Sequence, residues 1–349
     1  MEKLKTIKNL NEEFLDNRKH KGKESIEEFL KEQGLEHVPK IEVDFYFTDH
    51  QSKNAGEILI KLINDENVDI FMPEGTGVTP AIKEEYDKLS NGQITPEEFL
   101  ELRKARGVRE EQITDFHELL CRGLYNSHKK VLLVDLPEGH RNSKGVLTEQ
   151  MFDVWRRYEK IISEFVDKNL SFEDLKNKLS SFFKDFSNLQ KEREDFILDN
   201  IKKEVFKLFQ ENKLLQNKEK VKILFPIGSF HTRIYHEMKK DGNLIHRKFD
   251  EGMPYNYDTV FIQTLRTVHF EKRESIRNGV LNIIFAILKA NLEEKDVTEE
   301  ILSRMDISKI SSTEEEKVHE LYEIYRMSGS DEIFKNKAKV WFSEQLANK

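Results

Sequence analysis

Two histidines and two acids come directly after strand-like runs of the sequence. His50 follows 41–47 (IEVDFYF), Glu74 follows 68–72 (VDIFM), Asp135 ends 131–135 (VLLVD) and His231 follows 221–225 (VKILF). Ligands of open α/β sheets bind beyond the carboxyl ends of parallel strands, where the following loops converge. Imidazoles and carboxylates are ligands for zinc, manganese, iron or cobalt, and a metal with an open position activates bound water. The four residues therefore predict one metal-binding rim, and a carboxylate left over can act as general base.

The two histidines share a local pattern that supports a common site. Thr48 precedes His50 as Ser229 precedes His231, so both units read strand, hydroxyl residue, any residue, histidine, helix. Such a repeat is typical of duplicated βα units. The structural alternative stays open, because a histidine after a strand is often a cap or loop residue and acids favour helix N-termini.

Some polar residues fall outside this set. His117 and Cys121 lie four residues apart on a predicted helix and are interpreted as ordinary surface or core positions. Arg193 lies in a charged helical run, where a solvated surface position is the usual explanation.

The strand runs alternate with helix-like sequence, which predicts an α/β fold with a mostly parallel central sheet flanked by helices. The helical periods cover 55–63 and 114–127, and 259–263 (TVFIQ) is a weaker fifth strand candidate.

The remaining sequence is mostly helical. Aromatic residues recur with a 3.6-residue period from Phe152 to Phe186, which predicts a helical insertion at about 147–215. We predict an α/β domain over 1–270 that contains this insertion, and a helical C-terminal extension over 271–349 packed on the same domain. The insertion can be a lid over the crevice, a homodimer surface or only packing.

Composition limits the classes of function. The 349 residues carry a net charge of -8, which argues against a whole-surface attraction to nucleic acid or anionic membrane. The single cysteine, Cys121, excludes an intrachain disulfide and a thiolate zinc site. We find no signal-peptide pattern and no membrane span, and the expected location is the cytoplasm.

The order of these landmarks resembles the superfamily that groups the TraB and Tiki proteins with the erythromycin esterases and the ChaN haem-binding lipoproteins. The resemblance covers about 41–240. It depends on FTDH (47–50), IFMPEG (70–75, containing Glu74), VLLVDLP (131–137, containing Asp135), KEREDFILDNI (191–201) and GSFH (228–231). The KEREDFILDNI segment is similar to a helix that opens with an E-R-[DE] signature, here Glu192, Arg193 and Glu194. The first motif departs from the family pattern because Phe47 replaces its glycine, which removes backbone freedom at that turn.

The resemblance implies an α/β sheet with both histidines and the glutamate at its mouth. Tiki members are metal-dependent proteases, the esterases hydrolyse a lactone, and ChaN proteins hold haem. We therefore expect a hydrolase of an ester or amide, with a small-molecule or peptide substrate. His50, Glu74 and His231 bind a divalent metal (Mn, Co or Zn) or activate water, Arg193 stabilises negative charge and Asp135 orients a histidine. The alternatives are a non-catalytic ligand-binding or haem-binding protein and an inactive interaction protein.

Overall fold

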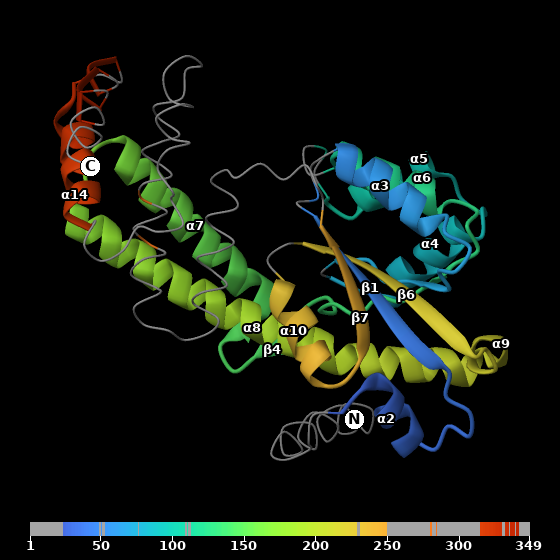
Figure 1. Cartoon of the computed structure of the whole chain (residues 1–349). Helices are drawn as coiled ribbons and strands as arrows, with labels where there is room; N and C mark the ends of the chain where they lie inside the picture. The colour runs from blue at the N-terminus through green and yellow to red at the C-terminus, as the bar shows by residue number, and fades with distance from the viewer. Residues whose placement is uncertain are drawn as a thin grey trace, which may run out of the picture.

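A parallel sheet flanked by helices forms the centre of the protein, as the sequence predicts (Figure 1). The computed structural model describes residues 24–48, 50, 53–75, 77–108, 110, 113–228, 231–249, 280, 284, 315–329, 332–334, 336–338 and 340–341. The sheet has five strands in the order β3-β2-β6-β1-β7, all parallel. Their bounds are β1 Lys40–Thr48, β2 Ile70–Phe71, β3 Lys130–Val131, β6 Lys220–Gly228 and β7 Leu244–Phe249.

The long strands β1 and β6 are buried on both sides, and their residues alternate between two cores. In β1, Val43, Phe45 and Phe47 face one core, whereas Tyr46 faces the other. This alternation follows from the two-residue period of a strand. Burial on both faces explains the nearly continuous apolar runs that made these strands recognisable.

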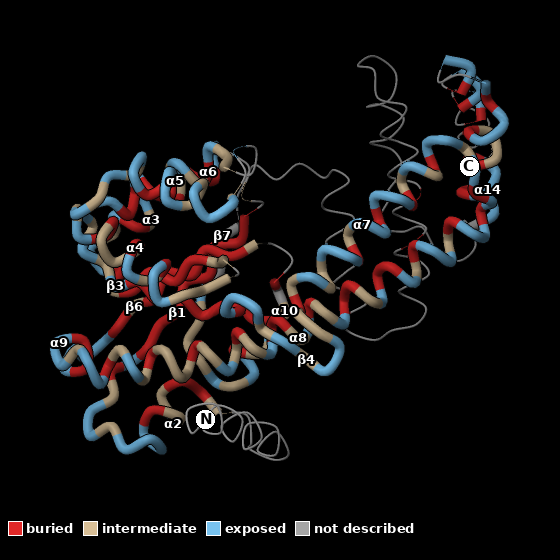
Figure 2. Tube along the Cα trace, turned by 180° about the vertical axis from the view of Figure 1, so that it is seen from behind, coloured by how far each residue is buried: buried red, intermediate tan, exposed pale blue. Residues whose placement is uncertain are grey.

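Helices cover both faces of the sheet. One face carries α3 (Lys53–Ile63), α4 (Pro80–Ser90), α5 (Pro96–Ala105) and α6 (Asp115–Leu124). The other carries α2 (Ile26–Glu32), the second half of α8 (Phe172–Glu211) and α10 (Thr232–Lys240). Buried positions line the sides of these helices that face the sheet (Figure 2). The short elements β4 (Arg141–Asn142), β5 (Gly145–Val146) and α9 (Lys213–Gln216) complete this part.

A third apolar core lies away from the sheet, in a part that we call the helical arm. The arm consists of α7 (Leu147–Val166), residues 172–186 of α8, and α14 (Glu315–Met327) with the described residues around it. In Figure 1 the arm extends to one side of the sheet, and α8 runs through both parts. Phe165, Phe183 and Tyr322 are fully buried in its core.

The structure corrects two details of the expected elements. The segment 191–201 does not open a helix, because it lies inside α8, a single helix of 40 residues. The fifth strand is β7, which the sequence reading missed, and 259–263 lies outside the described residues. The described residues after 271 pack against α7 and α8 in the arm. Among the described helices, none combines the length and the apolar character that a membrane crossing requires.

Candidate functional site

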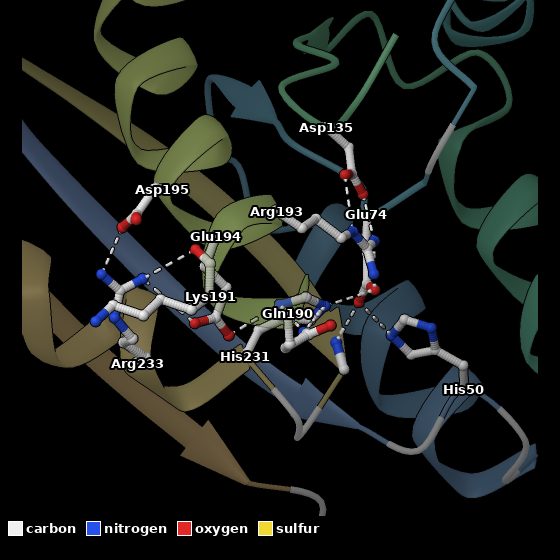
Figure 3. A network of polar contacts seen from close by, with 11 residues as sticks. His50, Glu74, Asp135, Gln190, Lys191, Arg193, Glu194, Asp195, His231 and Arg233 are labelled. Carbon is white, nitrogen blue, oxygen red and sulfur yellow. Dashed lines mark hydrogen bonds and ion pairs between the residues drawn. The ribbon is translucent and has the colours of Figure 1, made fainter. Parts of the chain in front are cut away.

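The topology brings His50 and His231 to one edge of the sheet. Their strands, β1 and β6, are neighbours, and Thr48 pairs with Gly228 at the carboxyl end. The next strand beyond β6 is β2, which leads to Glu74. Figure 3 shows the two imidazoles on either side of the Glu74 carboxylate. The predicted convergence of two distant histidines with an acid between them is thus present.

Glu74 is the shared partner of both histidines. His231 Nε2 lies 3.0 Å from Glu74 Oε1, and His50 Nε2 lies 3.7 Å from Oε2. The side chain of His231 is 2% exposed, whereas that of His50 is 26% exposed. His231 is therefore an internal partner of the carboxylate, whereas the His50 side chain is partly exposed, with its Nε2 atom buried beside Glu74.

Gly228 allows Glu74 to lie across the end of β6. Its backbone N–H donates to Glu74 Oε2 at 2.5 Å. A Cβ at this position would lie 3.1 Å from the same oxygen, which is closer than ordinary van der Waals contact. The glycine of the GSFH motif therefore has a local purpose, which is to admit the carboxylate.

Arg193 reaches the site from α8 and binds both strand-end acids. Its Nε and Nη2 donate to Asp135, in a two-pronged pair with Nε–Oδ1 at 3.0 Å. Nη2 also donates to Glu74 Oε1 at 3.0 Å. With a relative exposure of only 8%, Arg193 is no solvated surface group. Paired buried charges of this kind are costly to break.

The expected role of Asp135 is corrected by these contacts. Asp135 orients Arg193, not a histidine. Its Oδ1 also accepts from the backbone N–H of Leu136, and Oδ2 accepts from that of Gly75. A carboxylate has about four lone-pair positions, and all four are occupied here. Asp135 is therefore not available as a metal ligand in this arrangement.

The sequence reading missed two residues that hold His231 from behind. Glu194 Oε1 lies 3.2 Å from His231 Nδ1, and the amide of Gln190 lies 2.8 Å from the same nitrogen. Both residues belong to α8 and are four positions apart, which places them on one face of the helix. Glu194 is completely buried and is also paired with Arg233, at 3.5 Å. Glu192, the other acid of the signature, instead accepts from Asn142 at the surface.

His50 is held in an unusual backbone conformation. Its φ is 61°, in the left-handed region that non-glycine residues rarely adopt. Its N–H donates to Thr48 Oγ1 at 3.2 Å, and its carbonyl accepts from Thr114 Oγ1 at 2.8 Å. The imidazole stacks on Phe116 with ring centres 5.0 Å apart and planes 3° from parallel. Such a fixed, strained conformation is typical of functional positions.

His117 and Cys121 also lie in this region, and Cys121 is a buried core position, as the sequence allowed. Both line a cavity of about 360 Å³ that His50, Glu74 and Arg193 also line. His117 Nδ1 lies 2.9 Å from Thr114 Oγ1 and 3.3 Å from the backbone nitrogen of the same residue. Burial, with the charges of His50 and Arg103, lowers the pKa of His117 to about 4.

The central pair carries opposite charges. Burial by itself would raise the pKa of Glu74, but His231, Arg193 and His50 outweigh it and hold this pKa well below the usual range. Burial would lower the pKa of His231, yet Glu74 and Glu194 raise it to about 9 despite Arg193. At neutral pH His231 is thus an imidazolium that stabilises the Glu74 carboxylate.

Within the residues that the structure describes, no group of three or more His, Cys, Asp or Glu side chains is arranged to hold a metal ion as it stands. The donor types of His50, Glu74 and His231 nevertheless suit a divalent transition metal. The Nδ1 contact from His231 to Glu194 is the outer carboxylate contact that metal-binding histidines commonly make. Occupation would require His231 to lose a proton, so it would be favoured by higher pH.

Comparisons with known proteins leave the site to be judged on its geometry. No family model matches the chain, and no curated protein or solved structure matches it.

Proposed function

We propose that the protein is a hydrolase of small ester or amide substrates. The observation that supports this most directly is the convergence of His50 and His231 on Glu74, with Arg193 bound to the same carboxylate. Three of these residues, His50, Glu74 and Arg193, line one cavity. A partly exposed imidazole, a carboxylate beside its Nε2 and a fixed cation are the groups that general base catalysis with charge stabilisation requires.

His50 is the proposed general base. Its Nε2 takes a proton from a water molecule as the water oxygen attacks the substrate carbonyl, and the proton is then passed to the leaving alkoxide or amine. Glu74, 3.7 Å from Nε2, stabilises the imidazolium that forms in between. His231 keeps Glu74 ionised and in place, so it acts as a positioning residue.

Arg193 is the proposed site for the developing negative charge. Nε and Nη2 are bound by Asp135 and Glu74, whereas no partner of Nη1 occurs among the described residues. The guanidinium is therefore fixed in direction by two acids while a part of it can donate to a carbonyl oxygen. A preorganised donor of this kind typically contributes a factor of about 10²–10³ in rate.

The same residues define a proposed metal-dependent version of this activity. His50, Glu74 and His231 would hold Zn, Mn or Co, which when bound supplies a water of lowered pKa. The resemblance noted for the sequence favours this version. His50, Glu74 and His231 carry suitable donor atoms, whereas the lone pairs of Asp135 are already engaged in hydrogen bonds. A cytoplasmic location and a small-molecule or peptide substrate belong to the same proposal.

The test compares two histidines that share a backbone conformation. His50→Asn removes the imidazole and keeps a residue that tolerates positive φ, and His128→Asn is the matched control because His128 has φ 55° and is exposed. Full-length protein purified without chelators is assayed on p-nitrophenyl esters and amino-acid p-nitroanilides. We expect His50→Asn to lower kcat/KM by about 10²–10⁴ and His128→Asn to leave it unchanged.

The same samples address the alternatives. Elemental analysis before and after dialysis against a chelator separates a metal-dependent from a metal-independent hydrolase. A Soret band in the purified protein, with no turnover on either panel, would replace the proposal by haem binding. Equal activity of His50→Asn and wild type would remove His50 from the mechanism.

A further inference from the structure

The cavity beside His50 has a wall that the proposed chemistry does not require. Its volume of about 360 Å³ is near the lower end of the range for small-molecule pockets. The helices α4, α5 and α6 supply most of this wall, including Tyr86, Phe99, Leu100 and Leu120. These helices cover the same face of the sheet on which Pro226, another lining residue, lies.

The wall combines polar and apolar surface, and its aromatic rings are well fixed. Phe99 and Phe116 are each 2% exposed, and Tyr86 packs edge to face on Phe99 with ring centres 4.8 Å apart. The apolar surface reaches the reactive residue, because Phe116 is also the ring on which His50 stacks. A group bound against this wall would contact the support of the imidazole.

One cation in the wall lacks the partner that its neighbours have. On and beside α5, Arg106 is paired with Glu85 and Lys104 with Glu101. For Arg103, which lines the cavity, no ion pair occurs within the described part of the chain. Arg103 therefore contributes a positive charge to the lining of the cavity.

Two titratable groups that also line the cavity, Cys121 and Tyr86, do not neutralise the charge of Arg103. Burial raises the pKa of Cys121 and that of Tyr86 to about 12, and the charge of Arg103 only partly opposes either rise. Both groups are uncharged at neutral pH. The remaining charges of the wall, Glu74 and Arg193, are bound to each other. The described part of the cavity therefore offers apolar surface together with the positive charge of Arg103.

We infer that this cavity selects a small anionic substrate with an apolar body, whose carboxylate or other anionic group pairs with Arg103. The aryl or alkyl body lies on Phe99, Phe116 and Leu120, and the scissile bond lies at His50. The inference rests on the proposed function for the reaction, but the binding that it describes requires no turnover. Recognition of the anion by a guanidinium is charge-assisted and favours carboxylates.

The test uses two probes that differ in charge and hardly in shape, 4-phenylbutyrate and its amide 4-phenylbutanamide. Binding to the full chain is measured by calorimetry at pH 7 for wild type and Arg103→Gln. The control is Arg122→Gln on α6, whose side chain is 60% exposed and paired with Glu118. We expect wild type and the control to bind the carboxylate about tenfold more tightly than the amide, and Arg103→Gln to lose that preference.

A second variant checks the location. Leu100→Trp adds bulk to the partly exposed side of the wall and should weaken both probes. Equal affinity of wild type for the two probes, no binding of either at millimolar concentration, or an unchanged preference in Arg103→Gln would overturn the inference.

Failure of the inference and failure of the proposed function give different results. The probes are also measured with His50→Asn, which should keep the preference for the carboxylate. Retained preference with no hydrolysis of any ester or amide would reject the hydrolase and leave the pocket intact. Hydrolysis without a preference for anionic molecules would reject the pocket and leave the hydrolase.

Discussion

At the scale of single residues, Glu74 connects the whole site. Its carboxylate pairs with His231 and Arg193 and accepts a hydrogen bond from the N–H of Gly228, and His50 lies on its other side. Because the charges of His231, Arg193 and His50 outweigh the effect of burial, the carboxylate stays ionised. Loss of any one partner would leave the remaining buried charges less well compensated.

The raised pKa of His231 gives a pH dependence with a definite sign. The folded pKa of about 9 lies above the ordinary value of 6.5, so the stabilisation is complete below about pH 6.5 and is lost as pH rises towards 9. We expect the free energy of unfolding to fall by roughly 2 kcal/mol between pH 6.5 and 8.5, since each unit of pKa shift is worth about 1.4 kcal/mol. Urea unfolding at these two pH values measures this change.

The matched variants are His231→Gln and His37→Gln. Gln at 231 keeps a donor for Glu74 but has no proton to lose, so most of the decrease between the two pH values should disappear. His37 is exposed and bonds only a backbone carbonyl, so its variant should keep the decrease. A decrease of equal size in both variants would show that His231 is not its source.

Three site residues could be predicted because their positions follow from strand ends. A parallel sheet places His50, Glu74 and His231 at one edge whatever the details of packing. The partners of His231 and the role of Asp135 could not be predicted, since they depend on which face of α8 meets the sheet. The role of Phe47 could not be predicted either. It is fully buried against Phe45 and Tyr235 and thus belongs to the core.

At the scale of elements, the predictable features were those with a strong period. β1 and β6 are long, apolar and buried on both faces, and both agree with the predicted runs. β7 was missed because its sequence, LIHRKF, mixes apolar and charged residues, as is usual for a strand at the edge of a sheet. The continuity of α8 was also missed, although no Gly or Pro interrupts 172–211.

The packing of α3 on α6 gives a prediction at this scale. A Cβ on Gly56 would lie 2.9 Å from Leu119 Cβ and 2.7 Å from its Cδ1, so Gly56→Ala forces α6 to shift. We expect a loss of about 1 kcal/mol, because overpacking outweighs the helix propensity gained by alanine. Denaturant unfolding measures this loss, and a shift of α6 would also move Phe116 beneath His50.

A double-mutant cycle with Leu119→Gly identifies the cause. That background removes Leu119 Cβ as well as Cδ1, so Gly56→Ala should become stabilising by about 0.5–1 kcal/mol through helix propensity alone. The same destabilisation in both backgrounds would mean that α3 and α6 are not held together by this contact.

At the scale of the whole molecule, one helix joins the core of the arm to the sheet and its cores. The arm has its own core around Phe183, and the sheet has cores on both faces. We expect Phe183→Ala to lower the opening free energy of the arm by about 3–5 kcal/mol while the sheet keeps its protection. Hydrogen exchange resolved by mass spectrometry should show faster exchange over 172–186 and no change in β1 or β6.

The control variant is Phe225→Ala. Phe225 lies in the centre of the sheet and is 1% exposed. It should accelerate exchange in β1 and β6. If Phe183→Ala accelerated exchange in the sheet as much as in the arm, the two cores would unfold as one unit and the division would be wrong.

The continuity of α8 has a mechanical consequence. At 1.5 Å per residue its 40 residues span about 60 Å, and residues 190–194 stand near the middle of that length. One continuous helix carries both the packed face of the arm and Arg193. A tilt of the arm that α8 transmits would therefore turn the Arg193 guanidinium relative to Asp135 and Glu74.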